Sequence, residues 1–236
     1  MRCRNGLSKL VLALSAARNA FAVRLDVSDP DSIKAAASTI SHSMMQWYVG
    51  NQTGQIPGML PAPYYWWEAG AVMGTLIDYW YYTGDPTYNK VVTQALQFQS
   101  SPTRNFMPEN QTNTEGNDDQ AFWAFACMTA AEYKFPNPSA DQPQWLEMAQ
   151  GVWNSQQLRW DTDDCAGGLR WQIFIWNNGY NYKNSPSNAG FINLGARLAT
   201  YTGKRIFMVV MPRRQNLEGT TGCLARRLMH HGSNLA

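Results

Sequence analysis

Histidine is nearly absent from the sequence, which argues against two large classes of active site. The three histidines among the 236 residues are His42, His230 and His231. No CxxC pair and no cysteine–histidine spacing suited to zinc occurs. We therefore expect no zinc site and no nucleophile activated by histidine, and we predict that the protein works without a metal or a cofactor.

Cysteine is also scarce. The four cysteines are Cys3 near the start, Cys127 in an apolar segment, Cys165 in a glycine-rich segment and Cys223 near the end. Small secreted domains that depend on disulfides are dense in cysteine. These scattered positions do not indicate such a disulfide framework.

Charged residues make up only 15% of the chain, and their balance changes along it. The net charge of +2 combines +4 in residues 1–22, −7 in residues 23–203 and +5 in residues 204–236. Proteins that bind nucleic acids neutralise phosphates with clustered lysine and arginine, and an acidic central body does the opposite. We therefore expect no nucleic-acid partner.

Long apolar runs are missing except at the start, where basic residues and an apolar run over residues 7–17 precede the triplet Ala20-Phe21-Ala22. This pattern is typical of a secretory signal peptide, which we place at residues 1–22. The alternative is a short buried N-terminal helix, because polar residues interrupt the apolar stretch. Secretion agrees with two glycosylation sequons, at Asn51 and Asn110.

Apolar residues recur with the 3.6-residue period of a helix in six segments, and no comparable segment alternates with the period of a strand. The six segments are 33–44, 69–80, 88–96, 118–128, 145–153 and 191–199. The second, fourth and sixth are more apolar and follow long loops. This alternation predicts an all-α fold of three helical hairpins, each an outer helix followed by an inner one.

Residues at the expected helix ends agree with this interpretation. Asp29-Pro30 and Asp85-Pro86 are start signals, because aspartate caps a helix and proline suits its first turn. Gly50, Gly84 and Gly203 each follow an aromatic helix end, where a left-handed cap favours glycine. Their recurrence predicts an internal repeat, with hairpins stacked in a ring and long loops gathered around a cleft on one face.

Two adjacent carboxylates, Asp118 and Asp119, open the most apolar of the predicted helices, with Asn117 as its expected cap. Glycoside hydrolysis typically uses two carboxyl groups, one to protonate the leaving oxygen and one to attack the anomeric carbon or activate water. Neighbouring carboxylates also hinder each other's ionisation, which keeps a proton available near neutral pH. The alternative is that acidic residues simply favour a helix N-terminus.

Aromatic residues gather in the loops and helix starts that the hairpin scheme places at the same rim. They are Tyr64, Tyr65, Trp66, Trp67, Phe122, Trp123, Trp171 and Trp176. Sugar rings stack on such aromatic faces. Together with the carboxylate pair, they predict a carbohydrate-binding cleft.

Four segments resemble glycoside hydrolase family 76 and follow one another in the family's order. They are PAPYYWWEAG at 61–70, DYWYYTGD at 78–85, EGNDDQ at 115–120 and GGLRWQIF at 167–174. Within the family they are most similar to the fungal mannan endo-1,6-α-mannosidases of the cell surface. The resemblance covers about residues 25–203.

This resemblance implies an (α/α)6 barrel and retaining chemistry, by hydrolysis or transglycosylation, on α-1,6-linked mannan or another mannose-containing glycan. Asp118 would be the nucleophile and Asp119 the acid/base. It also implies a secreted or cell-surface enzyme of cell-wall biogenesis. Membrane association would be only through a C-terminal lipid anchor, of which this chain shows no signal.

Seven further residues are candidates for contacts with the sugar. They are Trp67, Glu68, Asn117, Trp123, Arg170, Trp171 and Tyr180. Glu68 is alternatively a helix N-terminal charge. Trp171 is alternatively a packing residue.

We expect residues 23–203 to be the N-terminal half of the barrel, with three of its six hairpins. Residues 204–236 depart from the family. This segment has two interpretations, an error in the gene model or a genuine basic interaction tail. Two other functions stay open. One is a catalytically inactive sugar-binding fragment, and the other is a helical-toroid glycosidase acting on another polysaccharide.

Overall fold

The computed structural model describes residues 23–163, 165 and 167–204, and it contains two compact units, residues 1–43 and 44–236. The predicted signal peptide at 1–22 and all but the first residue of the predicted tail at 204–236 lie outside the described residues. The regular structure of the described residues is six α-helices, one short 3-10 helix and one isolated bridge. The all-α prediction is confirmed.

Helix α2 (Pro30–Met45), most of which belongs to the first unit, begins where the Asp29-Pro30 signal predicts. The Asp29 carboxylate accepts a hydrogen bond from the backbone N–H of Asp31 at 3.0 Å. This bond satisfies one of the donors that every helix leaves unpaired at its start.

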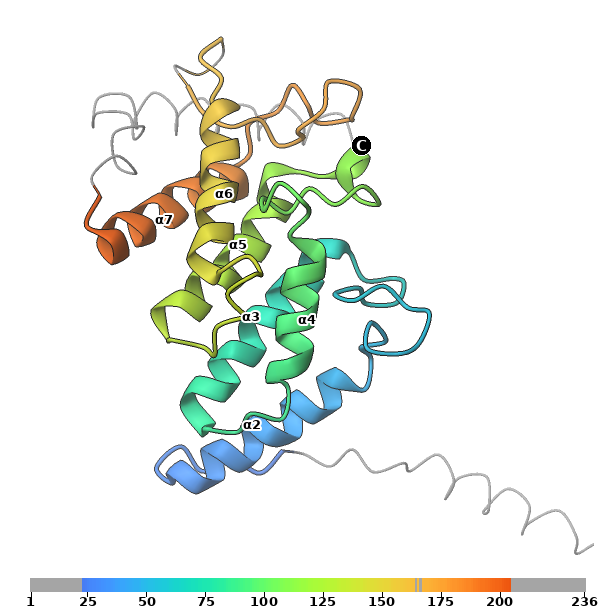
Figure 1. Cartoon of the computed structure of the whole chain (residues 1–236), viewed down its shortest axis with the longest axis vertical. Helices are drawn as coiled ribbons and strands as arrows, with labels where there is room; N and C mark the ends of the chain where they lie inside the picture. The colour runs from blue at the N-terminus through green and yellow to red at the C-terminus, as the bar shows by residue number, and fades with distance from the viewer. Residues whose placement is uncertain (1–22, 164, 166, 205–236) are drawn as a thin grey trace, which may run out of the picture. The chain divides into compact units, whose positions relative to one another are not determined.

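The second unit is built around helix α5 (Asn117–Glu132), which packs against α3 (Trp66–Thr83), α6 (Trp145–Leu158) and α7 (Ser185–Thr202). Helix α4 (Asn89–Gln99) packs on α3, and α6 also contacts α7 (Figure 1). The 3-10 helix η1 (Thr112–Thr114) lies in the loop before α5. All six predicted helices are present, and the one predicted to be apolar nearly all round is the central one.

Helix α5 is central because its aromatic and small residues fill the space between its neighbours. Trp123 is fully buried, and its ring stacks on Trp66 of α3 at 5.2 Å and on Phe106 at 5.5 Å between centroids. Gly70 of α3 lets the helices approach, because a Cβ there would lie 3.0 Å from the Trp123 ring. The prediction that Trp123 contacts the sugar is therefore wrong, since this side chain has no exposed surface.

The predicted helix ends are confirmed in part. Gly84 (φ 78°) and Gly203 (φ 69°) are left-handed caps of α3 and α7, as glycine permits without steric cost. Gly50 is not a cap, because α2 ends at Met45 and Gly50 instead packs so closely on Tyr48 that a Cβ would overlap the hydroxyl. The Asp85-Pro86 signal is displaced, because α4 begins only at Asn89 and Asp85 accepts hydrogen bonds within the preceding turn.

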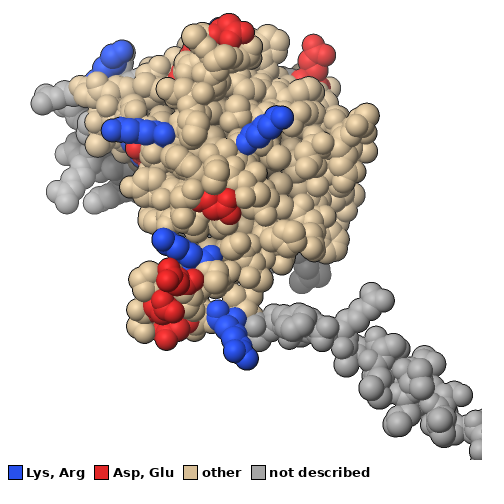
Figure 2. Space-filling model, turned by 60° about the horizontal axis from the view of Figure 1, so that its bottom comes forward, with Lys and Arg blue, Asp and Glu red and all other residues tan. Residues whose placement is uncertain are grey.

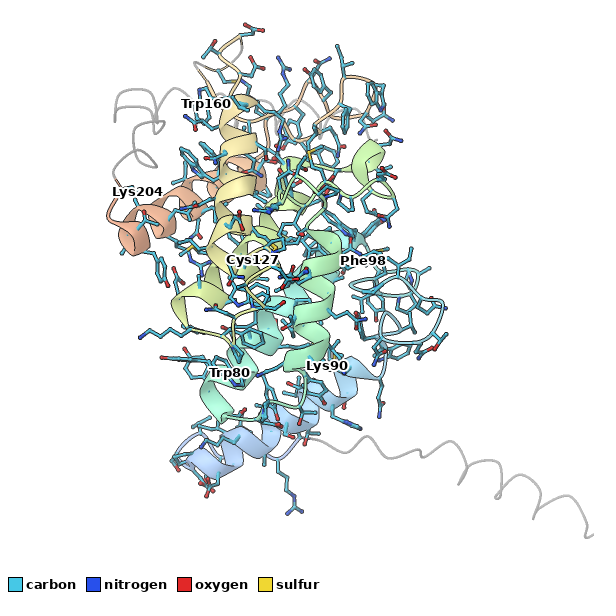
Figure 3. The ribbon with its side chains drawn as sticks, in the orientation of Figure 1. Trp80, Lys90, Phe98, Cys127, Trp160 and Lys204 are labelled. Atoms are coloured by element: carbon cyan, nitrogen blue, oxygen red, sulfur yellow. The ribbon has the colours of Figure 1, made fainter. Side chains whose placement is uncertain are left out.

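The two cysteines of the described residues differ in state. Cys127 lies in the middle of α5 (Figure 3), where it is free and fully buried, and burial raises the pKa of its thiol. Cys165 is disulfide-bonded, which the scattered cysteines of the sequence did not indicate.

Charged side chains are scattered over the face that Figure 2 shows, and most of that surface is uncharged, in line with the low charged content of the chain. Among the described residues, none of the helices combines the length and the apolar character needed to span a membrane.

Replacing Trp123 tests whether the aromatic stack is the centre of the core. We expect Trp123→Ala to lower the free energy of unfolding by about 3–5 kcal/mol, because it leaves a large cavity between α3 and α5. Urea unfolding followed by circular dichroism measures this change. Leu158→Ala is the control: this residue is 89% exposed at the end of α6, and its effect should stay within about 0.5 kcal/mol. Equal effects of the two substitutions would contradict the prediction.

Candidate active site

The start of helix α5 lies beneath the loop that leads from α6 to α7. Trp160, at the α6 end of this loop, is labelled in Figure 3. The backbone N–H of Asn117 donates to the carbonyl of Trp171 at 2.8 Å, and Gly116 forms an isolated antiparallel bridge with Gln172. These backbone contacts bring Trp171 next to the carboxylate pair, although more than fifty residues separate them in sequence.

Helix α5 is capped differently from the prediction. Gly116 is the cap residue, and its backbone N–H donates to the Asp119 carboxylate at 2.7 Å. Asn117 is the first helical residue, and its buried side chain donates to the carbonyl of Arg170 at 2.8 Å and accepts from Arg159 Nε at 2.9 Å. The amide of Asn117 thus bonds to protein partners that position the loop. Asn117 also lines a cavity together with Arg170, and its contact with the sugar stays a prediction.

Asp118 is held as an acceptor of several hydrogen bonds. Its Oδ2 accepts from the Asn184 amide at 2.6 Å, and its Oδ1 accepts from the backbone N–H of Asp119 at 3.0 Å. The side chain of Trp171 also donates to it. Burial raises the pKa of Asp118, and these donors act against that rise by stabilising the charged form. Such an environment suits a carboxylate that stays ionised.

Asp119 is the better proton donor of the pair. Burial and the neighbouring charge of Asp118 raise the pKa of Asp119 to about 6, against one opposing hydrogen bond from the Gly116 N–H. A Cβ placed on Gly116 would lie less than 3.0 Å from an oxygen of each aspartate. The two oxygens are therefore no more than twice that distance apart, which is compatible with the about 5–5.5 Å between the carboxyl groups of retaining glycosidases.

A third carboxyl group, Glu115, lies beside the pair and was not among the predicted site residues. It is 2% exposed, and neither carboxyl oxygen has a hydrogen-bond partner within the described structure. Burial raises the pKa of Glu115 to about 9, against the opposing charge of Arg159, while Asp119 adds to the rise. Leaving a buried polar group unsatisfied costs about 1–3 kcal/mol. The only sequence signal for Glu115 was its place directly before the Gly-Asn-Asp-Asp run.

Two of the three carboxyl groups, Glu115 and Asp119, line a cavity of about 470 Å³. Its lining residues are Tyr65, Trp66, Trp67, Gln111, Thr114, Glu115, Asp119, Trp171 and Gln172. The Trp67 ring packs against the Phe122 ring of α5, with 4.6 Å between the ring centroids. The structure thus brings the predicted residues Trp67 and Trp171 together with Asp119, in a cavity with aromatic walls and acidic groups.

The remaining candidates lie elsewhere. Glu68 accepts a hydrogen bond from the Tyr65 N–H at 2.6 Å and so caps α3, which favours the alternative of a helix N-terminal charge. Arg170 forms an ion pair with Asp161 and lies over the Tyr180 ring, 4.9 Å from its centroid. Arg170 and Tyr180 line a second cavity of about 280 Å³, which shares Gln172 with the first.

Within the described residues, no group of three or more histidine, cysteine, aspartate or glutamate side chains is arranged to hold a metal ion. The two predicted glycosylation residues, Asn51 and Asn110, both lie exposed in turns. Their modification stays a prediction.

Comparison with known proteins assigns the chain to a family. The model of glycosyl hydrolase family 76 matches residues 32–209. The chain belongs to this family. The resemblance seen in the four sequence segments is thereby confirmed.

Relatives within family 76 are fungal proteins. The chain is 48% identical over 204 residues to mannan endo-1,6-alpha-mannosidase DCW1 of Saccharomyces cerevisiae, covering 86% of this chain and 45% of the relative. It is 42% identical over 189 residues to mannan endo-1,6-alpha-mannosidase DFG5 of the same yeast, covering 80% and 41%. The crystal structure of Dfg5 from Chaetomium thermophilum in complex with glucosamine matches with a TM-score of 0.75 and 49% identity, over 78% of this chain and 47% of that one. The chain therefore spans less than half the length of these relatives.

Glu115 predicts a pH dependence of stability that does not require activity. An acid whose pKa is raised by folding stays protonated in the folded chain while the unfolded chain ionises, so stability falls as pH rises from the unfolded value, near 4.5, to about 9. One such proton limits the slope to about 1.4 kcal/mol per pH unit. We expect Glu115→Gln to remove part of this slope. The melting temperature of the variant should therefore increase relative to that of the wild type as pH rises through this window.

Glu109→Gln provides the matched control, because Glu109 is an exposed glutamate in the same loop. Thermal unfolding of the three proteins at intervals from pH 4 to 9 gives the comparison. Parallel curves for wild type and Glu115→Gln would show that Glu115 ionises freely in the folded chain.

Proposed function

We propose that this chain carries the catalytic carboxyl pair of a mannan endo-1,6-α-mannosidase that acts with retention of configuration. The observation that carries the proposal is the convergence of Asp118 and Asp119 above Gly116, at the edge of a cavity with tryptophan walls. The choice of α-1,6-linked mannan comes from the names of the relatives.

The two aspartates divide the chemistry by their surroundings. Asp118 attacks the anomeric carbon while Asp119 gives its proton to the leaving glycosidic oxygen, which breaks the α-1,6 bond and forms a glycosyl ester on Asp118. Asp119, now a carboxylate, takes a proton from water or from an acceptor sugar hydroxyl, whose oxygen displaces Asp118 from the anomeric carbon. The result is hydrolysis with water or transglycosylation with a sugar, and Asp119 recovers its proton in both.

We further propose that α2–α7 are three hairpins of an (α/α)6 barrel and that the protein acts at the fungal cell surface in cell-wall biogenesis. The neighbouring packing of α3, α5 and α7, with α4 on α3 and α6 on α5 and α7, supports the first part. The match to the Dfg5 structure supports it as well. The sequons at Asn51 and Asn110 and the leader-like start of the sequence support secretion.

Substitution of each aspartate tests the chemical roles. We expect Asp118→Asn and Asp119→Asn each to lower turnover of α-1,6-linked mannan oligosaccharides by at least about a hundredfold, since general acid–base catalysis alone contributes about 10²–10⁴-fold. The isosteric amides should leave the melting temperature nearly unchanged. Retaining glycosidases also release product with the starting anomeric configuration, which NMR of fresh product detects.

The outcomes separate the candidate functions. Wild-type turnover in either variant would refute the assignment of the pair. A wild-type chain that binds α-1,6-linked mannan oligosaccharides and releases no product would favour the inactive sugar-binding fragment. Faster turnover of xylan or uronic-acid oligosaccharides would favour another polysaccharide.

The pH profile of kcat/KM should report the two aspartates. Because Asp119 must be protonated, we expect activity to fall as pH rises through about 6, the pKa to which burial and Asp118 raise it. Asn184→Ala removes a donor that lowers the pKa of Asp118, so the acidic limb should move to higher pH. A profile that stays flat to pH 8 would show that Asp119 is not the acid, and an unmoved acidic limb in Asn184→Ala would show that Asp118 is not the group that must ionise.

A further inference from the structure

Glu115 is the acidic side chain of this site to which the proposed chemistry assigns no role. Its backbone is fixed, because its carbonyl accepts from the Ile173 N–H at 3.3 Å and the next residue, Gly116, is paired with Gln172. The side chain is buried, lines the cavity with Asp119, and has two oxygens without a hydrogen-bond partner in the described structure. Buried polar groups in native proteins are nearly always paired, so an exception calls for an explanation.

An internal ion pair does not provide that explanation. Arg159 is the cation whose charge acts on Glu115, but the ion pairs of the described residues do not join the two. The Arg159 guanidinium is instead engaged with Asn117 Oδ1 at 2.9 Å and with Gln120 Oε1. Glu115 thus lines the cavity with a buried carboxyl group that no internal partner satisfies.

The rest of the cavity wall indicates what the partner of Glu115 is. Trp67 and Trp171 supply apolar aromatic faces, and Gln111 and Gln172 supply amides. A pyranose ring has the matching chemistry, since its faces are apolar and its edge carries hydroxyl groups. A carboxyl group that keeps its proton has one donor and further acceptor positions, and a hydroxyl group can meet both.

We propose that Glu115 binds the substrate directly, through hydrogen bonds between its carboxyl group and hydroxyl groups of the hexopyranose unit in the cavity beside Asp119. This role rests on the proposed function only in taking the ligand to be a glycan. Glu115 would thereby help to decide which sugar is accepted, because removing the hydroxyl that it binds leaves a buried carboxyl group unpaired. The burial that raises the pKa of Glu115 to about 9 keeps the proton on it at neutral pH.

The test is a cycle of protein and ligand changes measured by calorimetry on the 236-residue chain. The probes are methyl α-1,6-mannobioside and its single-deoxy analogues, and the protein variants are Glu115→Met, Glu115→Gln and the control Glu109→Gln. We expect Glu115→Met to weaken binding of the parent sugar roughly tenfold or more. Glu115→Gln, which keeps a donor and an acceptor, should lose less, and the control should lose nothing.

Coupling is the result that a purely structural role would not produce. The wild type should bind at least one deoxy analogue more weakly than the parent sugar. Glu115→Met should bind that analogue and the parent sugar equally well. Losses that are the same in both proteins for every analogue would overturn the proposal. If Glu115→Met does not fold, the ¹³C resonance of the Glu115 carboxyl in the wild type replaces it: a shift on adding the sugar supports direct contact, and no shift excludes it.

Including methyl maltoside and methyl xylobioside separates this inference from the proposed function. Binding of α-1,6-mannobioside without coupling to Glu115 would overturn the role of Glu115 and leave the function standing. Coupled binding of another disaccharide in preference to mannobioside would retain the role of Glu115 and overturn the mannan assignment. No binding of any probe at millimolar concentration would overturn both.

Discussion

A helix start that is buried must find partners for its unpaired backbone and side-chain groups inside the protein, and the start of α5 is such a place. The backbone N–H of Asn117 donates to the carbonyl of Trp171 at 2.8 Å, and Arg159 at the end of α6 donates to the Asn117 side chain. Asn117 in turn holds the loop through the carbonyl of Arg170. The hydrogen bonds that satisfy the helix are therefore the same ones that place Trp171 over the aspartates, so the site follows from the packing of α5.

Three carboxyl groups within five residues differ in the number of hydrogen-bond donors that they receive and in the charges beside them. Asp118 receives donors from Asn184, Trp171 and a backbone N–H, and Asp119 receives one from the Gly116 N–H. Glu115 has none within the described structure. Burial raises the pKa of all three, and neighbouring charges also act on Asp119 and Glu115. The group with most donors is the one best suited to remain ionised. Local structure thus gives the three carboxyl groups of one short segment three different surroundings, and the proposed division between nucleophile and acid rests on this difference.

The sequence predicted many of the features that depend on neighbours along the chain, although Gly50, Asp85-Pro86 and Asn117 do not take the capping roles expected of them. The apolar period gave all six helices, and the caps at Gly84 and Gly203 followed from residues within a turn. Features set by distant contacts were missed. The sequence places Trp123 near the start of a helix at the rim of the cleft, yet Trp66 and Phe106 enclose its ring. Likewise, Asn184 reaches Asp118 across 66 positions of sequence. Nothing in the sequence alone marks Glu115 as buried, because its burial depends on a loop some sixty residues later.

Gly116 adopts ordinary extended angles, φ −95° and ψ 160°, so its backbone would admit any amino acid. Its restriction is one of space, since the first carbon of any side chain would occupy the point toward which both aspartate oxygens are directed. The absence of a side chain at this position is therefore what leaves room for the two acids to approach each other. A substitution at position 116 would therefore have to shift both carboxylate groups, so the glycine and the aspartate pair are tied together by space rather than by backbone angles.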